Sequence, residues 1–148
     1  MRLLTSAIVG LLLAAGPATP EQARAKEARK LIDGWTVAIN AGKGLEAIEQ
    51  FFARDYVWHV PGEDIRGREA FKGVFARFSQ TCPTARFTAL EVVTERDLVS
   101  VRWGARCTSE AASSMASISI DRFANGQFVE GWEISSTTKG WLVPGSGK

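Results

Sequence analysis

Three stretches in the first half of the chain repeat their apolar residues with a helical period. The first begins at a Thr19-Pro20 capping sequence and ends at Asn40-Ala41-Gly42, and its apolar positions recur three and four residues apart: Ala28, Leu31, Ile32, Trp35 and Ile39. A shorter helix is expected over residues 44–52. A third begins at Gly67 with the same spacing: Phe71, Val74, Phe75 and Phe78. One short strand, residues 56–60, is expected between the second and third helices.

The second half alternates apolar and polar residues, which is the pattern of β-strands. Four strands are expected, over residues 86–94, 98–107, 116–123 and 128–136. Helices followed by a run of antiparallel strands predict an α+β fold in which the helices pack on one face of a curved sheet. The chain has 148 residues, enough for one such domain with its own core.

Residues 1–18 do not fit this domain. They combine a basic Arg2, an apolar run over residues 3–15, and small residues at Gly16 and Ala18, which is the pattern of a signal peptide cleaved after Ala18. The apolar run is too short to span a bilayer comfortably, although an uncleaved anchor stays open as the alternative. We therefore predict a single domain over residues 19–148, exported to the periplasm or secreted, with no membrane contact after cleavage.

Charge and residue usage argue against two kinds of partner. The 18 basic and 16 acidic residues nearly balance and form no cluster of Lys and Arg, so no nucleic-acid partner is expected. One His and the lack of a C-x-x-C motif argue against a metal site. No cofactor is expected.

Cys82 and Cys107 flank the first predicted hairpin. Folding residues 86–94 against residues 98–107 about Arg96 brings the two cysteines within a few positions of each other. An oxidising compartment would let a disulfide persist, and a loop of this length could contribute about 3 kcal/mol. Two buried free cysteines are the alternative.

The last predicted hairpin, around Asn125-Gly126, can pair in two registers. A two-residue turn would set Asp121 opposite Glu130, two like charges. A three-residue loop with Gly126 in the left-handed conformation shifts the pairing by one and brings Arg122 near Glu130.

The second register separates apolar from polar residues, and such a separation normally determines register. One face then holds Ile118, Ile120, Arg122, Phe128, Glu130, Trp132 and Ile134, and the other holds Ser117, Ser119, Asp121, Val129, Gly131, Glu133 and Ser135. We predict this register, with the first face buried and Arg122 and Glu130 as a structural ion pair on it.

Three stretches carry a family resemblance: FFARDYVWHVPGEDIRGREAFKGVF, DLVSVRW and DRFANGQFVEGW. The most specific part is the R-F-x-x-G-x-x-x-E-x-W run over residues 122–132. In this order of elements the chain resembles the SnoaL-like branch of the nuclear transport factor 2-like superfamily over residues 21–144. The resemblance implies a cone-shaped α+β barrel, in which a curved antiparallel sheet packed against three N-terminal-half helices encloses an apolar pocket. It also implies a homodimer formed through the sheet.

The usual catalytic groups of the family do not carry over. Where SnoaL-like polyketide cyclases have an Asp and a His, this sequence has Ser136 and the Cys107-Thr108-Ser109 stretch. Where ketosteroid isomerases have an Asp base and an oxyanion-binding Tyr, it has Val60 and Trp35. Each replacement removes a group that transfers protons near neutral pH.

Tryptophans are the main feature of the expected pocket. Four of the five tryptophans are placed inward by their positions on the predicted helix and strands, and indole rings suit a planar or polycyclic ligand. Ordinary core packing is the alternative. The predicted ligand-binding residues are Trp35, Trp58, Val60, Phe75, Trp103, Arg122, Trp132 and Ser136.

His59 is the one side chain with an ordinary pKa near neutrality, although its strand parity points it away from Trp58 and Val60. Three hypotheses follow. The first, which we favour, is an exported protein that binds a small hydrophobic or polycyclic molecule. The second is an isomerase, cyclase or hydratase that uses His59 and Glu130 as catalytic groups. The third is a homodimeric interaction module whose pocket is filled by core side chains.

Overall fold

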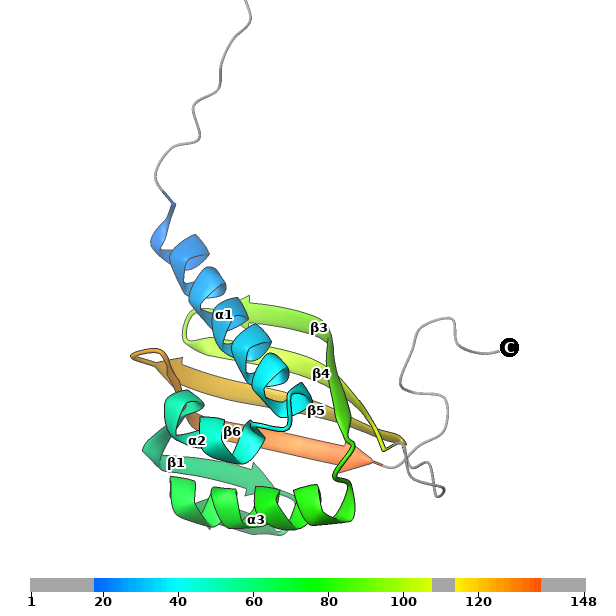
Figure 1. The fold of residues 1–148 in the computed structure, drawn as a ribbon. Coiled ribbons are helices and arrows are strands. Elements are labelled where there is room, and N and C mark those ends of the chain that lie inside the picture. Colours follow the sequence, from blue (N-terminus) through cyan, green and yellow to red (C-terminus); the bar gives the residue numbers. More distant parts are fainter. Residues whose placement is uncertain (1–17, 108–113, 137–148) are drawn as a thin grey trace, which may run out of the picture.

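The computed structural model describes residues 18–107 and 114–136. Its helices are α1 (Pro20–Asn40), α2 (Gly44–Phe51) and α3 (Arg68–Thr81), and its strands are β1 (Phe52–Val60), β2 (Glu63–Arg66), β3 (Arg86–Glu95), β4 (Leu98–Arg106), β5 (Ser114–Ala124) and β6 (Gln127–Ser136). The strands form one curved sheet in the order β2-β1-β6-β5-β4-β3, with the helices on one side of it (Figure 1). The predicted α+β fold is confirmed. Apart from its last residue, the predicted signal peptide lies outside the described residues.

The sheet is mixed, which the sequence did not predict. β1 runs parallel to β6, with His59 beside Trp132, whereas the other neighbours are antiparallel. β2 is an additional short strand that folds back on β1 after a turn at Gly62, whose φ is 87°. Alternation of side chains predicts that a segment is a strand, but it carries no information about which distant strand lies beside it.

The first helix follows its sequence signals closely. The Thr19 hydroxyl accepts a hydrogen bond from the Gln22 backbone amide at 3.2 Å, and the Gln22 side chain accepts one from the Thr19 amide at 2.8 Å. This capping box satisfies amide groups that have no partner within the helix. The buried residues of α1 are the five apolar positions predicted from the period: Ala28, Leu31, Ile32, Trp35 and Ile39.

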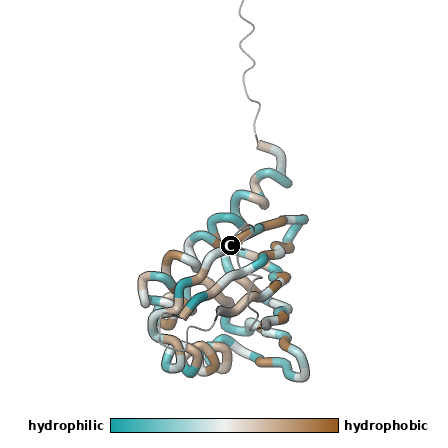
Figure 2. The backbone as a smooth tube through the Cα atoms, turned by 90° about the vertical axis from the view of Figure 1, so that its right-hand side faces the viewer, coloured by the Kyte–Doolittle hydropathy of each residue, from teal (hydrophilic) through white to brown (hydrophobic). Residues whose placement is uncertain are grey.

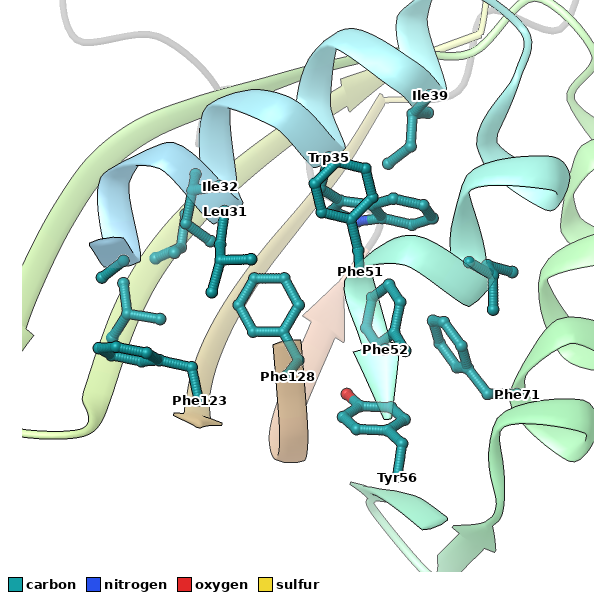
Figure 3. Close-up of a cluster of buried hydrophobic side chains, with 14 of the residues drawn as sticks. Leu31, Ile32, Trp35, Ile39, Phe51, Phe52, Tyr56, Phe71, Phe123 and Phe128 are labelled. Atoms are coloured by element: carbon teal, nitrogen blue, oxygen red, sulfur yellow. The ribbon is translucent and has the colours of Figure 1, made fainter. Parts of the chain in front are cut away.

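An aromatic cluster joins the helices to the sheet. Phe52, the first residue of β1, has its ring centroid 4.7 to 5.2 Å from four other rings, those of Trp35, Tyr56, Phe71 and Phe128. These residues come from α1, β1, α3 and β6, and Figure 3 shows them facing one another between the helices and the sheet. Burial of such large apolar rings stabilises the domain.

The β5–β6 hairpin has the predicted register, but it reaches that register by another route. Arg122 lies opposite Glu130 and Ile120 opposite Trp132. The turn has two residues, Asn125 and Gly126, with φ of 52° and 74°, as expected for a tight hairpin turn. The register then shifts by one between Arg122 and the next residue of β5, so that a bulge on β6 takes the place of the predicted three-residue loop.

The prediction of which hairpin face is buried was wrong. The apolar residues Ile118, Ile120, Trp132 and Ile134 are 37% to 69% exposed, whereas Ser117, Ser119 and Asp121 are at most 9% exposed. Alternation determines which residues share a face, but not which face meets the helices. The alternation of hydrophobic and hydrophilic residues along the strands can be followed in Figure 2. Here the polar face lines a cavity, and the apolar face lies on the outer side of the sheet.

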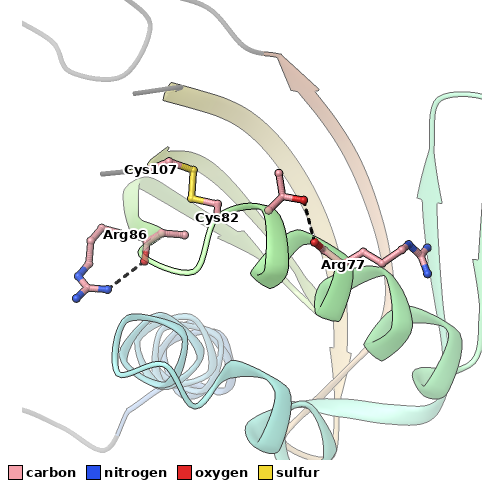
Figure 4. The surroundings of a disulfide bond; sticks show 6 residues. Arg77, Cys82, Arg86 and Cys107 are labelled. Atoms are coloured by element: carbon pink, nitrogen blue, oxygen red, sulfur yellow. Dashed lines mark hydrogen bonds between the residues drawn. A yellow bond between two sulfur atoms is a disulfide. The ribbon is translucent and has the colours of Figure 1, made fainter. Parts of the chain in front are cut away.

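A disulfide joins Cys82, at the end of α3, to Cys107, just after β4, with their Cα atoms 5.7 Å apart (Figure 4). This is the pairing expected from the hairpin geometry. No helix in the described part of the chain is long and apolar enough to cross a membrane.

Candidate functional site

A cavity of about 240 Å³ lies between the helices and the inner face of the sheet. Half of the described residues that line it are aromatic, with Trp35 from α1, Trp58 from β1 and Phe75 from α3 among them. Five of the predicted ligand-binding residues line this cavity: Trp35, Trp58, Val60, Phe75 and Trp103. An apolar, concave space of this kind is the usual setting for a small-molecule site.

Two other predicted ligand-binding residues, Trp132 and Arg122, are not part of this wall. Trp132 lies on the outer face of the sheet and is 37% exposed, because the hairpin presents that face outward. Arg122 shares the outer face and lines a separate surface depression beside Arg24 and Asp97. Ser136 pairs with Ala116 at the end of β6, and its side chain lies outside the described residues.

Polar groups gather on the sheet side of the cavity. They come from the inward face of the β5–β6 hairpin and from β1: Tyr56, Ser117, Ser119, Asp121, Glu133 and Ser135. Asp121 and Glu133 are diagonal neighbours, since Asp121 pairs with Gly131 and Glu133 pairs with Ser119. Two carboxyl groups therefore share one partly enclosed, largely aromatic space.

Asp121 has a strongly perturbed pKa. Burial raises the pKa of its carboxyl from 3.8 to about 7, and the charge of Glu133 acts in the same direction. A hydrogen bond from the Ser119 hydroxyl, 2.7 Å long, acts in the opposite direction. Because its pKa lies near neutrality, Asp121 can take up and release a proton under ordinary conditions.

The Glu133 carboxyl is perturbed in the same direction. Burial raises the pKa of its carboxyl above the ordinary value, and hydrogen bonds with Ser117 and Trp58 oppose this shift only in part. Two neighbouring carboxylates repel each other, so the pair holds one proton more readily than it loses both. The pair can supply an acid and a base at the same pH.

The hydroxyl of Tyr56 completes this polar group. Burial, and then the charges of Asp121 and Glu133, raise its pKa well above the ordinary value, so it remains a hydrogen-bond donor. A Cβ at Gly131 would collide with the Tyr56 Oη and lie 2.5 Å from the Asp121 Oδ1. Both oxygens therefore approach the same backbone position, and the lack of a side chain at Gly131 makes this possible.

The predicted catalytic pair, His59 and Glu130, lies outside this cavity. His59 Nδ1 is 2.6 Å from Asp64 Oδ1 and its Nε2 is 3.1 Å from Glu130 Oε1. The imidazole stacks on Trp132, with centroids 5.2 Å apart. Hydrogen bonds with Asp64 and then with Glu130 raise the pKa of His59. The structure does bring His59 and Glu130 together, but on the outer face of the sheet.

Arg122 extends this outer cluster. Its Nε lies 3.4 Å from Glu130 Oε2, and its Nη1 lies 2.6 Å from Asp97 Oδ2. The predicted Arg122–Glu130 ion pair exists, but the two side chains are 41% and 33% exposed. It is a surface pair, contrary to the expectation that it would be buried.

Sequence reasoning missed Asp121, Glu133 and Tyr56 as residues that line the cavity. The first two were assigned to the solvent side of the hairpin, and Tyr56 was read only as the start of a strand. Ser117 and Ser119 offered a usable signal. They share a strand face with Asp121, and their short side chains leave room for a cavity. Among the described residues, no cluster of three or more His, Cys, Asp or Glu side chains could hold a metal ion.

Comparison with known proteins agrees with this architecture. The family model of the SnoaL-like domain matches residues 29–131. The crystal structure of IdmH from Streptomyces antibioticus, assigned as a polyketide cyclase, is 28% identical, with a TM-score of 0.66 over 73% of this chain and 91% of that chain. A loop-truncation variant of IdmH is 30% identical, with the same TM-score and coverage.

A more distant structure has the same fold. AclR from Streptomyces galilaeus, assigned as a hydroxylase, is 16% identical, with a TM-score of 0.68 over 75% of this chain and 90% of that chain. No curated protein sequence matched the chain. With the fold, the pocket and the family match in agreement, the chain belongs to the SnoaL-like family of the nuclear transport factor 2-like fold.

Proposed function

We propose that the protein binds a small, uncharged and largely apolar molecule in this cavity and catalyses a proton transfer on it. The observation that carries the proposal is the Asp121 carboxyl, buried at the cavity wall with a pKa raised to about 7. A pKa near the working pH is what an acid–base catalyst requires. Cyclase-type chemistry, as assigned to the relative IdmH, is one form of such catalysis.

The lining residues favour an uncharged ligand over an anion. Aromatic rings line much of the cavity, and no Lys, Arg or His is among the described residues that line it. An anionic ligand would meet the Glu133 carboxylate without a compensating positive charge, and burying such a pair of like charges is costly. Flat rings such as those of Trp35 and Trp58 suit a planar or polycyclic molecule.

The polar residues divide into an acid, a base and a second donor. In the proposed reaction, the Glu133 carboxylate removes a proton from a carbon next to a ligand carbonyl. The carbonyl oxygen receives a hydrogen bond from Tyr56 and a proton from Asp121, which gives the enol and leaves Asp121 ionised. Return of a proton to a different carbon and of the hydroxyl proton to Asp121 restores the enzyme and yields an isomer.

This proposal keeps the pocket ligand expected from the sequence and changes the catalytic residues. The usual cyclase and isomerase positions still hold groups that do not transfer protons, such as Val60 and Trp35. Asp121 and Glu133 provide a different pair of groups inside the same cavity. His59 and Glu130 are assigned no role in the reaction, because they lie on the outer face.

Deuterium exchange on 1-tetralone tests the proposal. This bicyclic ketone is uncharged and carries a flat fused benzene ring, and NMR in D₂O reports exchange of the protons next to its carbonyl. The parent protein should accelerate exchange, and Asp121→Asn and Glu133→Gln should each reduce the acceleration by about 10²-fold or more. His59→Gln, on the outer face, is the matched control. Acceleration that survives both pocket substitutions would refute the proposed roles.

Two further expectations also remain proposals. We propose that residues 1–18 direct export and are removed, which the composition of that segment supports. We also propose that two copies associate through the outer sheet face, where Ile118, Ile120 and Ile134 are exposed beside Trp132. Light scattering at several protein concentrations would measure the association.

A further inference from the structure

A short chain of buried hydrogen bonds leads from β4 to the Asp121 carboxyl. The indole Nε1 of Trp103 donates to the Ser119 hydroxyl at 3.0 Å, and that hydroxyl donates to Asp121 Oδ2 at 2.7 Å. Trp103 and Asp121 are each 9% exposed and Ser119 is 3% exposed. Water therefore has little access to these bonds, and low solvent access strengthens each of them.

The chemistry of the indole determines which group donates in each of these hydrogen bonds. An indole N–H can donate but cannot accept, so Ser119 must be the acceptor toward Trp103. The hydroxyl has a single proton, which is then directed toward the next acceptor at a suitable distance, Asp121 Oδ2. Oδ2 consequently accepts a hydrogen bond whether the carboxyl is ionised or neutral.

We propose that Trp103 and Ser119 are positioning residues that fix the acidic proton of Asp121 on Oδ1. This oxygen approaches the backbone of Gly131 together with the Tyr56 hydroxyl. With the proton on Oδ1, Asp121 and Tyr56 present two donors side by side, where a single ligand oxygen can receive both. The inference rests on the proposed function, because it assigns Asp121 the role of the acid.

Few other titratable groups complicate this arrangement. In the described part of the chain, those that face Asp121 are Tyr56 from β1 and Glu133 from β6. The groups nearest to it from β4 and β5 are Trp103 and Ser119, which do not titrate in the accessible range. A change in the titration of Asp121 after substitution of Trp103 or Ser119 can therefore be attributed to the hydrogen-bond chain.

Carbon-13 NMR of protein labelled at the aspartate carboxyl carbons tests the inference, with Asp121→Asn to assign the signal. In the parent, the Asp121 midpoint should lie near pH 7. Ser119→Ala removes the bond that favours the ionised form and should raise the midpoint by about one pH unit. Trp103→Phe keeps an aromatic ring but frees the hydroxyl to rotate, so it should shift the midpoint in the same direction by a smaller amount.

Trp35→Phe is the matched control, because Trp35 lines the same cavity from α1 and its ring contacts are with Phe51, Phe52 and Phe75. It should leave the midpoint unchanged. An unchanged midpoint in Ser119→Ala would overturn the inference. If the Asp121 midpoint shifts no more in Trp103→Phe than in Trp35→Phe, Trp103 is not a positioning residue.

A second measurement needs no substitution at Trp103 or Ser119. In the parent protein, the Trp103 indole N–H resonance should change with pH at the same midpoint as the Asp121 carboxyl, because the two are linked through Ser119. An indole signal that does not follow that midpoint would contradict the proposed link from Trp103 through Ser119 to Asp121. All these measurements are made without ligand, so they remain decisive even if 1-tetralone is not a substrate and the proposed function fails.

Discussion

The hydroxyl of Tyr56 and the carboxyl of Asp121 meet at the backbone of Gly131. Tyr56 belongs to β1 and Asp121 to β5, and both side chains reach over β6, which lies between these two strands in the sheet. A Cβ at residue 131 would stand 2.5 Å from Asp121 Oδ1 and would also overlap Tyr56 Oη. The absence of a side chain in the middle of β6 therefore shapes the polar part of the cavity.

The first prediction concerns this glycine. Gly131→Ala should displace Tyr56 or Asp121 and destabilise the protein by about 1–3 kcal/mol, the usual range for overpacking. Urea denaturation at neutral pH measures the change. Gly73→Ala is the control, because its added methyl group would meet only the mobile end of Arg77, at 3.8 Å. The control should be neutral or gain up to about 1 kcal/mol, since alanine favours helix. Equal destabilisation by the two substitutions would contradict the crowding at residue 131.

The second prediction concerns the pH dependence of stability. Burial raises the pKa of Asp121 from 3.8 to about 7, so between these values the folded protein holds a proton that the unfolded chain has released. The stabilisation from this group is complete below about pH 4 and is lost as pH rises to about 7. The loss amounts to as much as about 4 kcal/mol.

Asp121→Asn should remove most of this dependence. The stability of the variant relative to the parent should therefore increase between pH 5 and pH 8, as measured by urea denaturation at several pH values. Asp33→Asn, at an exposed position of α1, controls for the loss of a carboxyl group elsewhere. A constant difference between Asp121→Asn and the parent across this range would show that Asp121 is not the buried acid described above.

The sequence predicted local structure well because the signals for it are local. The five buried residues of α1 follow from their spacing, and the pairing of Arg122 with Glu130 follows from the separation of apolar and polar residues. In both cases the residues that decide the structure lie within a few positions of one another along one helix or one hairpin.

The site was less predictable, because it depends on which face of the hairpin meets the helices. Ser119 and Asp121 look like solvent-facing residues when the hairpin is considered alone. They are inside because α1 and α3 cover that face and leave a cavity against it. The opposite face, with Ile120 and Trp132, has the composition of a core and lies outside.

The third prediction uses the fact that His59 is the only histidine. Hydrogen bonds with Asp64 and then with Glu130 raise its pKa, so Asp64→Asn should lower the pKa more than Glu130→Gln does. Proton NMR of the single imidazole measures both without ambiguity of assignment. The stabilisation from His59 should be present below pH 6.5 and should be lost as pH rises through the folded-state pKa. A pKa that does not change in Asp64→Asn would refute this geometry.

The same variants test the Arg122–Glu130 pair. A buried pair would lose about 1–3 kcal/mol when Glu130 is replaced by Gln, because the arginine would remain charged and unpaired. Both side chains are partly exposed and Arg122 also binds Asp97, so the loss should be below about 1 kcal/mol. Urea denaturation distinguishes the two values, and a loss above 2 kcal/mol would indicate that the Arg122–Glu130 pair is buried.

The fourth prediction concerns export and the disulfide. Protein recovered from the periplasm or medium should begin near Thr19, and its intact mass without reductant should be two hydrogens below that of the dithiol form. Reduction should destabilise the domain by about 3 kcal/mol, since the bond closes a loop with a sequence separation of 25 residues. Two free thiols in the native exported protein would show that Cys82 and Cys107 are not bonded to each other.

The last prediction separates the two faces of the sheet by comparing Trp132 with Trp103. Trp103 is 9% exposed and lines the cavity, so Trp103→Ala should cost about 3–5 kcal/mol, as buried large-to-small changes do. Trp132 is 37% exposed and stacks on His59, so Trp132→Ala should cost less than this. It should leave quenching of tryptophan fluorescence by 1-tetralone at the same midpoint concentration as in the parent.

If the outer face joins two copies, Trp132→Ala should also weaken that association, because the exposed indole lies beside Ile120 and Ile134 on the same face. Light scattering over a range of protein concentrations would show a larger monomer fraction than in the parent, whereas Val37→Ala, which shortens an exposed apolar side chain on α1, should leave it unchanged. If Trp132→Ala instead weakens the fluorescence quenching by 1-tetralone and leaves the association unchanged, Trp132 contributes to the cavity, as the sequence predicts.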